Sequence, residues 1–494
     1  MRRLAALLSL VLAAPTTAAP LPPDPDLESS RDRLARSPPR PPPDYGRTAV
    51  ETLLFVGFGT GWYWLNADEN SPDWDYSRLD QRFSEGHIRF DNNHYTINNL
   101  VHPVDGAAYH VFARANALPV HEAFLTGFVA STGWEYVLEY RERVSINDLV
   151  FTPVGGMALG EVLFQLGDYL SSAPEGGTWA HEAAAWTLGL PTRLHAAMDG
   201  RSNPPGPTDR LGFSARRDHD FRFGYEALRA DDEEASHGLF AHVRIDSLRG
   251  HGQPGRFRLL YLDGNQVDLQ LRMLFREAGS AELDLRARAA LLGYYTQTFD
   301  RFGDGSSGAA RLTLAFEHTQ RWLPGPQDRI STVHLPGPSA ELRSRQGALD
   351  LQLRVDLWPD FAAVDALAYP AWRDANPTAT TQSVVEEFGY YYAFGLTAQV
   401  EGSARWGALE VGGRARHSRL ESFDGLDRLQ ETVTADVRER DLILELGGWI
   451  GYVDPDTLTH VRLGIEGLQR TSEVGDVRAH LERRRVLLQV GLAL

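Results

Sequence analysis

Five of the side chains between residues 102 and 161 that could bind a metal ion or move a proton are candidates for such chemistry. They are one histidine and four carboxylates: His102, Glu135, Glu139, Asp148 and Glu161. Glu135 and Glu139 are four residues apart, so both lie on one face of a helix. His102, Glu135, Glu139 and Asp148 are the candidates for catalysis. Because histidine and carboxylate ligands suit zinc, manganese or iron, His102, Glu135, Glu139 and Glu161 are the candidate metal ligands, although no H-E-x-x-H spacing supports them.

Two further assignments compete with a metal site. In the first, His102 is the general base of a hydrolase and Ser131 or Ser145 is its nucleophile, but neither serine lies in a G-x-S-x-G segment. In the second, the polar residues are structural, because a carboxylate among apolar neighbours needs a partner and an arginine can supply two hydrogen bonds. This structural network, which we favour, comprises Asn99, His102, Arg114, Glu135, Glu139, Asn147, Asp148 and Glu161.

Glycines at helical spacing flank the S-I-N-D segment at residues 145–148. Gly127 lies on the helical pattern before this segment, and Gly156 and Gly160 lie on the pattern after it. Small residues four positions apart allow two helix backbones to approach each other closely. The spacing therefore predicts a close-packed helical hairpin with its turn at residues 145–148.

The elements that must position these residues belong to a chain with export signals. Residues 1–19 contain two arginines, an apolar run and small residues, as a signal peptide does. A proline-rich linker is expected at 20–45. Residues 46–200 form a predicted helical domain, in which every uninterrupted apolar run is shorter than the ~20 residues of a lipid-spanning helix. The chain has no cysteine, which excludes disulfides and thiolate chemistry.

After residue 208 the hydrophobic period changes from that of a helix to two. In Leu349–Leu357, for example, aliphatic residues alternate with Asp350, Gln352, Arg354 and Asp356. Long strands with arginine and aspartate together on the polar face suit a wet lumen. The fold class is therefore α+β, with the helical block followed by an antiparallel transmembrane β-barrel at 208–494, of about 12 strands and between roughly 10 and 14. A soluble β-sandwich with a helical cap is the alternative fold.

Three details of the barrel follow from the same pattern. Tight turns are expected at 263–265 and 454–456, and longer polar loops at 323–345 and 359–385. An aromatic girdle is expected where aromatic residues lie near strand ends: Tyr294, Tyr295, Trp322, Trp358, Tyr390 and Tyr392.

Four sequence words carry a resemblance to a known family. They are N-N-L-V-H-P (98–103), W-E-Y-x-x-E (134–139), S-I-N-D (145–148) and G-G-x-x-L-G-E (155–161). In this order they resemble an uncharacterised family of Gram-negative envelope proteins, described only as a domain of unknown function. The resemblance implies an exported outer-membrane protein and brings no activity or catalytic residue with it. The same region is also similar to VanZ-like helical membrane proteins, which implies helices that lie against lipid.

The function expected from these observations is that of an outer-membrane barrel acting as a channel, an envelope organiser or a lipid-handling protein. The helical block would plug the barrel, lie on its periplasmic side or pack against its wall. The alternative is a lipid-modifying or metal-dependent hydrolase centred on the polar helical residues; whether the chain is an enzyme stays open, with a non-enzymatic role favoured. The net charge of −17 argues against nucleic acid as a partner. Outer-membrane lipid and the barrel-assembly machinery are the expected partners, and no cofactor is predicted.

Overall fold

The computed structural model describes residues 41–494, apart from short gaps. The gaps are 71–79, 84–87, 92, 140–142, 175–176, 204–206, 216, 231–233, 249, 264–265, 278, 323–327, 424–432 and 436, and the side chains of 66–70. The predicted signal peptide at 1–19 and all but the end of the predicted linker at 20–45 lie outside the described residues.

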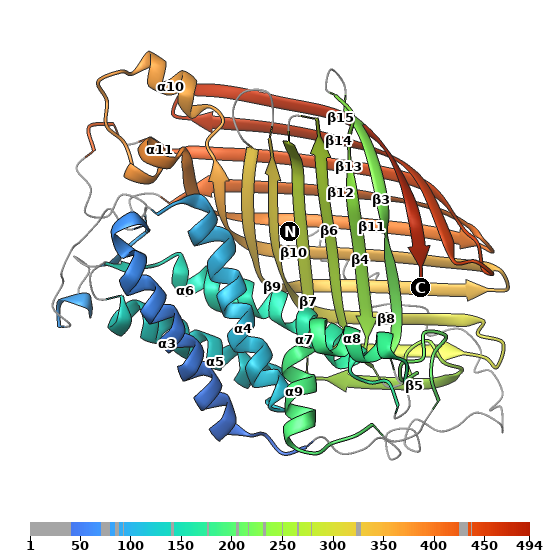
Figure 1. The fold of residues 1–494 in the computed structure, drawn as a ribbon. Coiled ribbons are helices and arrows are strands. Elements are labelled where there is room, and N and C mark those ends of the chain that lie inside the picture. The colour runs from blue at the N-terminus through green and yellow to red at the C-terminus, as the bar shows by residue number, and fades with distance from the viewer. Residues whose placement is uncertain are drawn as a thin grey trace.

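Residues 45–198 form a block of helices, called the helical block here (Figure 1). Its elements are α3 (Tyr45–Asn70), η1 (Gln81–Phe83), β1 (Ile88–Arg89), η3 (Ile97–Val101), α4 (His102–Ala115), α5 (Val120–Gly133), η4 (Trp134–Leu138), β2 (Val144–Ser145), α6 (Asp148–Val150), η5 (Phe151–Gly155), α7 (Gly156–Leu170), α8 (Trp179–Leu188) and α9 (Leu190–Met198). Of these, η3, η4 and η5 are π-helical turns, and α6, η5 and α7 join into one continuous helix.

Residues 218–493 form an antiparallel β-barrel. The elements are β3 (Asp218–Ala230), β4 (Ser236–Asp246), β5 (Gly255–Tyr261), β6 (Gln266–Arg276), β7 (Gly279–Phe299), β8 (Gly305–Arg321), β9 (Asp328–Gln346), β10 (Leu349–Asp365), α10 (Tyr369–Ala375), α11 (Ser383–Phe388), β11 (Tyr390–Trp406), β12 (Leu409–Ser422), β13 (Glu439–Val453), β14 (Thr459–Val474) and β15 (Val477–Ala493). Each strand pairs with its neighbours, β15 pairs with β3, and β7 pairs with β8, which closes the sheet. Since β5 and β6 pair with successive parts of β7, they make one interrupted strand, and the described residues close a barrel of twelve strands. The predicted fold class is confirmed.

The barrel is apolar outside and charged inside. On β10 the outward Leu349, Leu351 and Leu353 are 38–43% exposed, whereas the inward Arg354 and Asp356 are 9% and 1% exposed. The same alternation leaves apolar side chains exposed on the outward faces of β11, β13, β14 and β15. This is the reverse of a water-soluble sheet, which buries its apolar face. It is the pattern of a barrel whose outer wall meets lipid.

The continuous helix from α6 to α7 lies on the outer wall of the barrel. Beneath it is a row of outward-facing side chains that are paired from strand to strand, called the outer row here: Phe361, Val333, Phe316, Ala287, Leu269, Val243 and Phe221. At one end Phe151 packs against Phe361, with ring centroids 5.5 Å apart; at the other Tyr169 packs against Phe221 at 5.2 Å. The helix therefore crosses seven strands along a line of hydrogen-bonded pairs.

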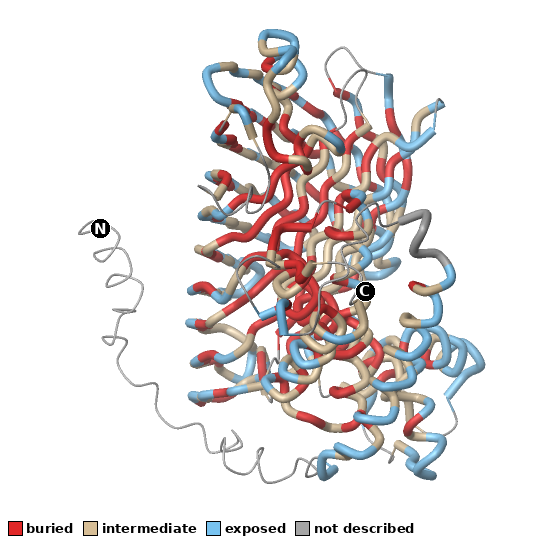
Figure 2. The backbone as a smooth tube through the Cα atoms, turned by 90° about the vertical axis from the view of Figure 1, so that its left-hand side faces the viewer, coloured by how far each residue is buried: buried red, intermediate tan, exposed pale blue. Residues whose placement is uncertain are grey.

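This position corrects one expectation about the helical block. The block packs against the barrel wall, as one of the three expected arrangements had it, and it does not plug the lumen. The physical reason is the lumen itself, which is already occupied by long charged side chains. Figure 2 shows that buried residues concentrate in the barrel and that the outermost helices are largely exposed.

Two expected connections are wrong. Most of the expected loop at 323–345 is strand β9, which contains Pro336 and Pro338; the register shifts around these prolines, and a bulge is where a sheet tolerates proline. The expected tight turn at 263–265 is not a hairpin, because β5 before it and β6 after it continue in the same direction along β7. The turn at 454–456 does join β13 to β14.

The expected aromatic girdle is also largely wrong. Tyr390 and Tyr392 face outward but are buried beneath the helical block, and Trp358 and Tyr295 are buried inside the barrel. Of the aromatic residues named, Tyr294 is exposed on the outer wall, at 42%. Alternation along a strand distinguishes the two faces, but it does not reveal which part of the outer face another domain covers.

One helix within the described residues, Asp148–Leu170, is long and apolar enough to cross a membrane by length and composition. No such helix was expected, because each uninterrupted apolar run is shorter than ~20 residues. In the structure the helix is continuous through Pro153 and Glu161.

Candidate functional site

The polar residues predicted in the helical block divide into two separate networks. The first, the Glu161 network, joins α4 to α7. Arg114 binds the Glu161 carboxylate with two hydrogen bonds, at 2.8 and 3.1 Å, and His110 Nε2 lies 2.9 Å from it. Gln165 donates to the same carboxylate at 2.7 Å. All four side chains are buried, so the charge of Glu161 is compensated inside the block.

The Glu161 network also ties the helical block to the barrel. Arg114 lies 3.2 Å from Asp263, between β5 and β6, and Ser247, which follows β4, donates to Gln165 at 2.8 Å. A buried arginine with two carboxylate partners fixes both the helix pair and its position on the wall.

The second network, the π-turn cluster, gathers around the S-I-N-D segment. It consists of Asp91, Asn93, Asn98, His102, Glu135, Ser145, Asn147 and Asp148. Asn147 receives hydrogen bonds from the amide of Asp91 and the hydroxyl of Ser145, both at 2.8 Å, and donates to Asp148 at 2.8 Å. His102 Nε2 lies 3.4 Å from Asp148. Three of the four sequence words thus meet in this cluster, and the fourth, at 155–161, contributes Glu161 to the other network.

Two π-helical turns position the main residues of this cluster. Asn98 lies in η3 and Glu135 in η4, and a π-turn inserts an extra residue that re-aims the side chains around it. Glu135 accepts a hydrogen bond from the amide of Ser145 at 2.9 Å, and Arg82 donates to its backbone carbonyl. Burial raises the pKa of Glu135 well above its usual range, and the neighbouring carboxylate of Asp148 raises it further. The cluster therefore favours the neutral form of Glu135 over its charged form.

Tyrosines join the π-turn cluster to the barrel. Tyr390, at the start of β11, donates to the carbonyl of Asn93 at 2.9 Å, and Asn98 donates to the hydroxyl of Tyr392 at 3.1 Å. From the helical side, Tyr95 donates to Ser331 at 3.0 Å and to the carbonyl of Ala363 at 3.2 Å. The cluster is therefore enclosed between the helices and the outer wall.

The remaining predicted residues are dispersed. Asn99 donates to the carbonyl of Tyr95, Glu139 accepts a hydrogen bond from Arg82 through its carbonyl, and the hydroxyl of Ser131 donates to the carbonyl of Asp148. Of the candidate metal ligands, Glu161 belongs to the other network. In the part of the chain that the structure describes, one group of His and carboxylate atoms lies within 4.8 Å of one another, and it consists of Asp218, Asp246 and His251 on the barrel.

The predicted packing glycines differ in how much space surrounds them. A Cβ on Gly156 would lie 2.4 Å from the backbone of Gly106, and one on Gly160 would lie 2.8 Å from His110 Cβ. A Cβ on Gly127 would meet nothing closer than 3.9 Å. The close contact is thus between α4 and α7, where Gly106 of α4 lies against Gly156 of α7.

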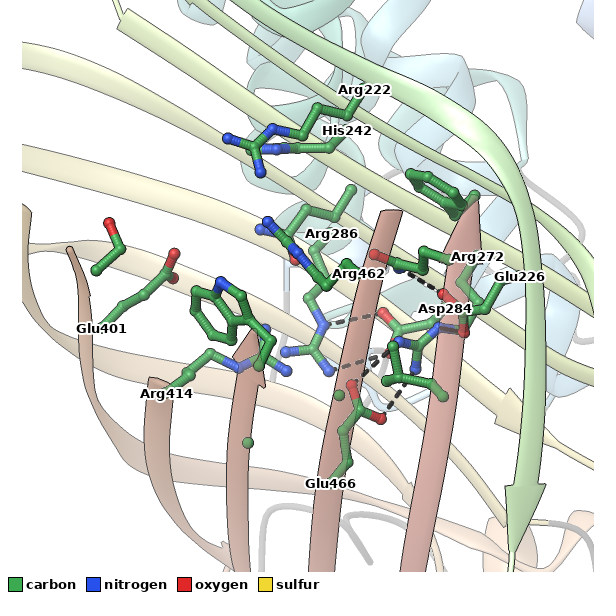
Figure 3. Close-up of a pocket in the computed structure, with 18 of the residues that line it drawn as sticks. Arg222, Glu226, His242, Arg272, Asp284, Arg286, Glu401, Arg414, Arg462 and Glu466 are labelled. Atoms are coloured by element: carbon green, nitrogen blue, oxygen red, sulfur yellow. Dashed lines mark hydrogen bonds and ion pairs between the residues drawn. The ribbon is translucent and has the colours of Figure 1, made fainter. Parts of the chain in front are cut away.

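A chamber of about 210 Å³ lies inside the barrel (Figure 3). It is lined by seven arginines and seven carboxylates: Arg222, Arg244, Arg272, Arg286, Arg354, Arg414 and Arg462, with Asp220, Glu226, Asp268, Asp284, Glu401, Glu410 and Glu466. Many of the pairs cross the lumen. Arg272 on β6 binds Glu466 on β14 at 3.1 Å, and Arg286 on β7 lies 3.4 Å from Glu445 on β13, the strand opposite in the ring.

Helices α10 and α11, called the cap here, pack over the barrel end that carries the β10–β11 connection. The inward side chains there are apolar, and Trp372 of α10 and Val385 of α11 pack against them. Below this cap, Arg470 is fully buried between Asp441, at 2.6 Å, and Asp328. An apolar layer and a layer of ion pairs thus lie in series across the lumen.

Arg414 differs from the other arginines of the chamber. It extends into the chamber from β12 (Figure 3), and among the described residues no carboxylate lies within 4 Å of it. Its charge can therefore attract an anion that enters the chamber.

Residues 87–190 match the model of a family described as Domain of unknown function (DUF3943). The predicted resemblance to an uncharacterised family is confirmed for this stretch, which holds both polar networks. No match to a curated protein sequence was found.

Several solved outer-membrane barrels resemble the chain loosely. The NanC porin is 8% identical, with a TM-score of 0.25, over 55% of this chain and 100% of that one. In-vitro folded OmpT of Vibrio cholerae is 6% identical (TM-score 0.22; 57% and 98%), and the channel DcaP of Acinetobacter baumannii is 9% identical (TM-score 0.21; 58% and 99%). The barrel architecture of this chain stands on its own strand pairing.

Proposed function

We propose that this chain is exported to the outer membrane of a Gram-negative bacterium, where it forms a non-conducting barrel that anchors the helical block. Its role is to organise the envelope or handle lipid, rather than to pass solutes. The observation that carries the proposal is the sequence of barriers across the lumen: paired charges around the chamber, the buried Arg470 layer and the apolar cap.

The electrostatics of the lumen support a closed barrel. Every carboxylate that lines the chamber has an arginine or histidine partner within 4 Å among the described residues. Opening a path for ions would separate charges that are already desolvated, and breaking one such pair costs about 3–5 kcal/mol. An ion that crosses the lumen would therefore have to separate several of these ion pairs one after another.

The turn lengths support one orientation. The two longest connections between barrel strands, β10–β11 and β12–β13, lie at the end opposite the C-terminus. That end also carries the two-residue β14–β15 turn, whereas the two-residue connections β9–β10 and β11–β12 lie at the same end as the C-terminus. Outer-membrane barrels have short periplasmic turns and longer extracellular loops. The capped end therefore faces outward. The partners of the whole protein are then the barrel-assembly machinery and outer-membrane lipid.

A structural role for the helical block is supported by the burial of its polar residues. Glu135 and Asp148 are 1% and 2% exposed, and both accept hydrogen bonds within the block. A hydrolase centred on them would have to expose them to its substrate. The networks instead fix the helices to one another and to the wall.

The test is ion conductance across a planar lipid bilayer. The refolded protein, checked by its heat-modified mobility on a gel, is expected to give no defined conductance steps. A variant in which residues 367–388 are replaced by a short Gly-Ser turn and Arg470 by alanine is expected to conduct, while Arg419→Ala, an exposed residue, serves as the matched control. Steady open-pore steps from the unaltered protein would refute the proposal.

A further inference from the structure

Between residues 49 and 65, the outermost helix of the block, α3, exposes an entirely apolar face. The residues of α3 that are exposed between positions 49 and 65 are Ala49, Val50, Leu53, Leu54, Gly57, Phe58, Gly61, Trp62 and Leu65. Of these, Leu54 is 69% and Phe58 is 74% exposed. The polar Glu51, Thr52 and Thr60 lie on the opposite, half-buried side. A helix at a water-facing surface has the opposite arrangement.

Other helices of the block also expose apolar residues. On α5 the exposed residues after the first turn are Leu125, Phe128 and Val129, at 42–66%. On α8 and α9 they include Trp186, Leu190, Leu194 and Met198. Isolated exposed apolar residues are normal on a soluble protein, but an entirely apolar exposed helix face such as that of α3 marks contact with lipid or another protein.

The position of the helical block along the barrel wall indicates that lipid, rather than another protein, covers its exposed apolar residues. The block lies on the outer row, and the outward residues that continue the same strands beyond the row are exposed and apolar. On β3, Phe223 follows the covered Phe221; on β11, Phe394 follows the covered Tyr392. The block therefore interrupts the lipid-facing belt of the barrel and lies at the same depth.

The charged residues of α3 lie near its two ends. Near the start of α3, Arg47 binds Asp199 at 2.7 Å and His195 lies 2.5 Å from Glu51. From Thr52 to Leu65, α3 contains no charged residue, a length of about 21 Å at 1.5 Å per residue. At the far end of this stretch Trp62, Tyr63, Trp64 and Trp134 cluster, as aromatic residues do at the boundary between hydrocarbon and water.

We propose that the exposed faces of α3 and α5 contact the acyl chains of the same bilayer that surrounds the barrel. The helical block is then a second lipid-facing wall beside the strands, and lipid surrounds the barrel and block together. The inference rests on the proposed insertion of the barrel, and it adds that the block is embedded rather than exposed to the periplasm.

The absence of cysteine from the chain allows a direct test with single spin labels. Cysteine is placed at Leu54 or Phe58 on α3, at Leu463 on the outer wall of β14 as the lipid control, and at Arg478 beside the β14–β15 turn as the water control. All four positions are at least half exposed, so labelling should not disturb folding. The labelled full-length proteins are refolded into phosphatidylethanolamine–phosphatidylglycerol vesicles. Collision of the label with oxygen, which concentrates in hydrocarbon, is compared with collision with a water-soluble nickel chelate.

The expected result is that labels at 54 and 58 behave like the label at 463, with several-fold more oxygen collision relative to nickel than at 478. Nickel access at 54 and 58 with lipid-like behaviour at 463 would overturn the embedding of the block and leave the inserted barrel intact. Nickel access at 463 as well would overturn the insertion of the barrel and this inference with it. Spin–spin broadening at 58 would show that a second copy, and not lipid, covers the face, which also overturns the proposal.

Discussion

Helices α4 and α7 approach each other closely at Gly156, and replacing this glycine with alanine is a severe test of the described packing. The new Cβ would lie 2.4 Å from the carbonyl carbon of Gly106, 2.5 Å from its Cα and 2.8 Å from the amide nitrogen of Ala107. All three are backbone atoms, so no side-chain rotation relieves the overlap. An ordinary contact begins at 3.4 Å, so α4 and α7 must separate by about 1 Å.

The cost of that separation has two parts. Overpacking a well-packed core costs about 1–3 kcal/mol. The same helix pair holds the bidentate contact of Arg114 with Glu161, at 2.8 and 3.1 Å, and a shift of about 1 Å breaks it. Since breaking a buried ion pair costs about 3–5 kcal/mol, we expect Gly156→Ala to destabilise the helical block by at least about 3 kcal/mol.

Two other glycines provide matched comparisons. Gly127→Ala adds the same methyl group where the nearest atoms are 3.9 and 4.0 Å away, so it should be neutral or stabilise the helix by up to about 1 kcal/mol. Gly160→Ala, with its nearest contact at 2.8 Å from a side-chain atom, should fall between the two. The assay is denaturant unfolding in detergent micelles, followed by the helical far-UV circular dichroism signal. Equal stability of the Gly156 and Gly127 variants, within about 0.5 kcal/mol, would refute the close contact.

The remaining predictions concern protons, lumen charges and the attachment of the block. Folded Glu135 holds its proton to a higher pH than the unfolded chain does, so its contribution to stability is complete in acid and is lost as the pH rises through the folded pKa. Glu135→Gln should therefore gain stability relative to the original protein with rising pH; parallel pH profiles would contradict the assignment. Arg470→Met should lower the stability of the barrel by about 3–5 kcal/mol, because it leaves two buried carboxylates, whereas Arg414→Met should change it by less than about 1 kcal/mol. The temperature at which the gel mobility changes measures the stability of both variants. The same temperature for the two variants would show that the ion pairs of Arg470 contribute no more to stability than Arg414 does. Tyr95→Phe removes the hydrogen bonds to Ser331 and Ala363 and should weaken docking of the block by about 1–2 kcal/mol, seen as faster amide hydrogen exchange in α7; unchanged exchange would contradict the anchoring role.

The fold could be predicted from the sequence because the period of two is long and regular. In Leu349–Leu357 every second residue is aliphatic, which fixes both the strand and the two faces of the barrel wall. Strand β9 was missed because Pro336 and Pro338 read locally as a loop, while bulges in its pairing accommodate them. The local sequence of β9 cannot show that bulges in its pairing with the neighbouring strands accommodate these prolines.

The candidate site was predictable in its residue types but not in its connections. The need of Glu161 for an arginine follows from its apolar neighbours, and Arg114 is that partner. His110, Gln165 and Gly106 were not among the predicted site residues, although helical spacing of four from Glu161 could have indicated Gln165. The contacts with Tyr390 and Ser331 join residues more than 200 positions apart, and nothing in the local sequence indicates them.

The outer row has a consequence for how the two parts of the chain come together. Its seven side chains belong to seven strands, and each faces outward only while its strand is paired in the native register. A slip of one residue in any of these strands would turn its contribution into the lumen and place an inward side chain, such as Arg286 or Arg288 of β7, under the helix. Docking of the helix thus depends on native strand register, because only a barrel with correct register across these seven strands presents the surface that α7 fits.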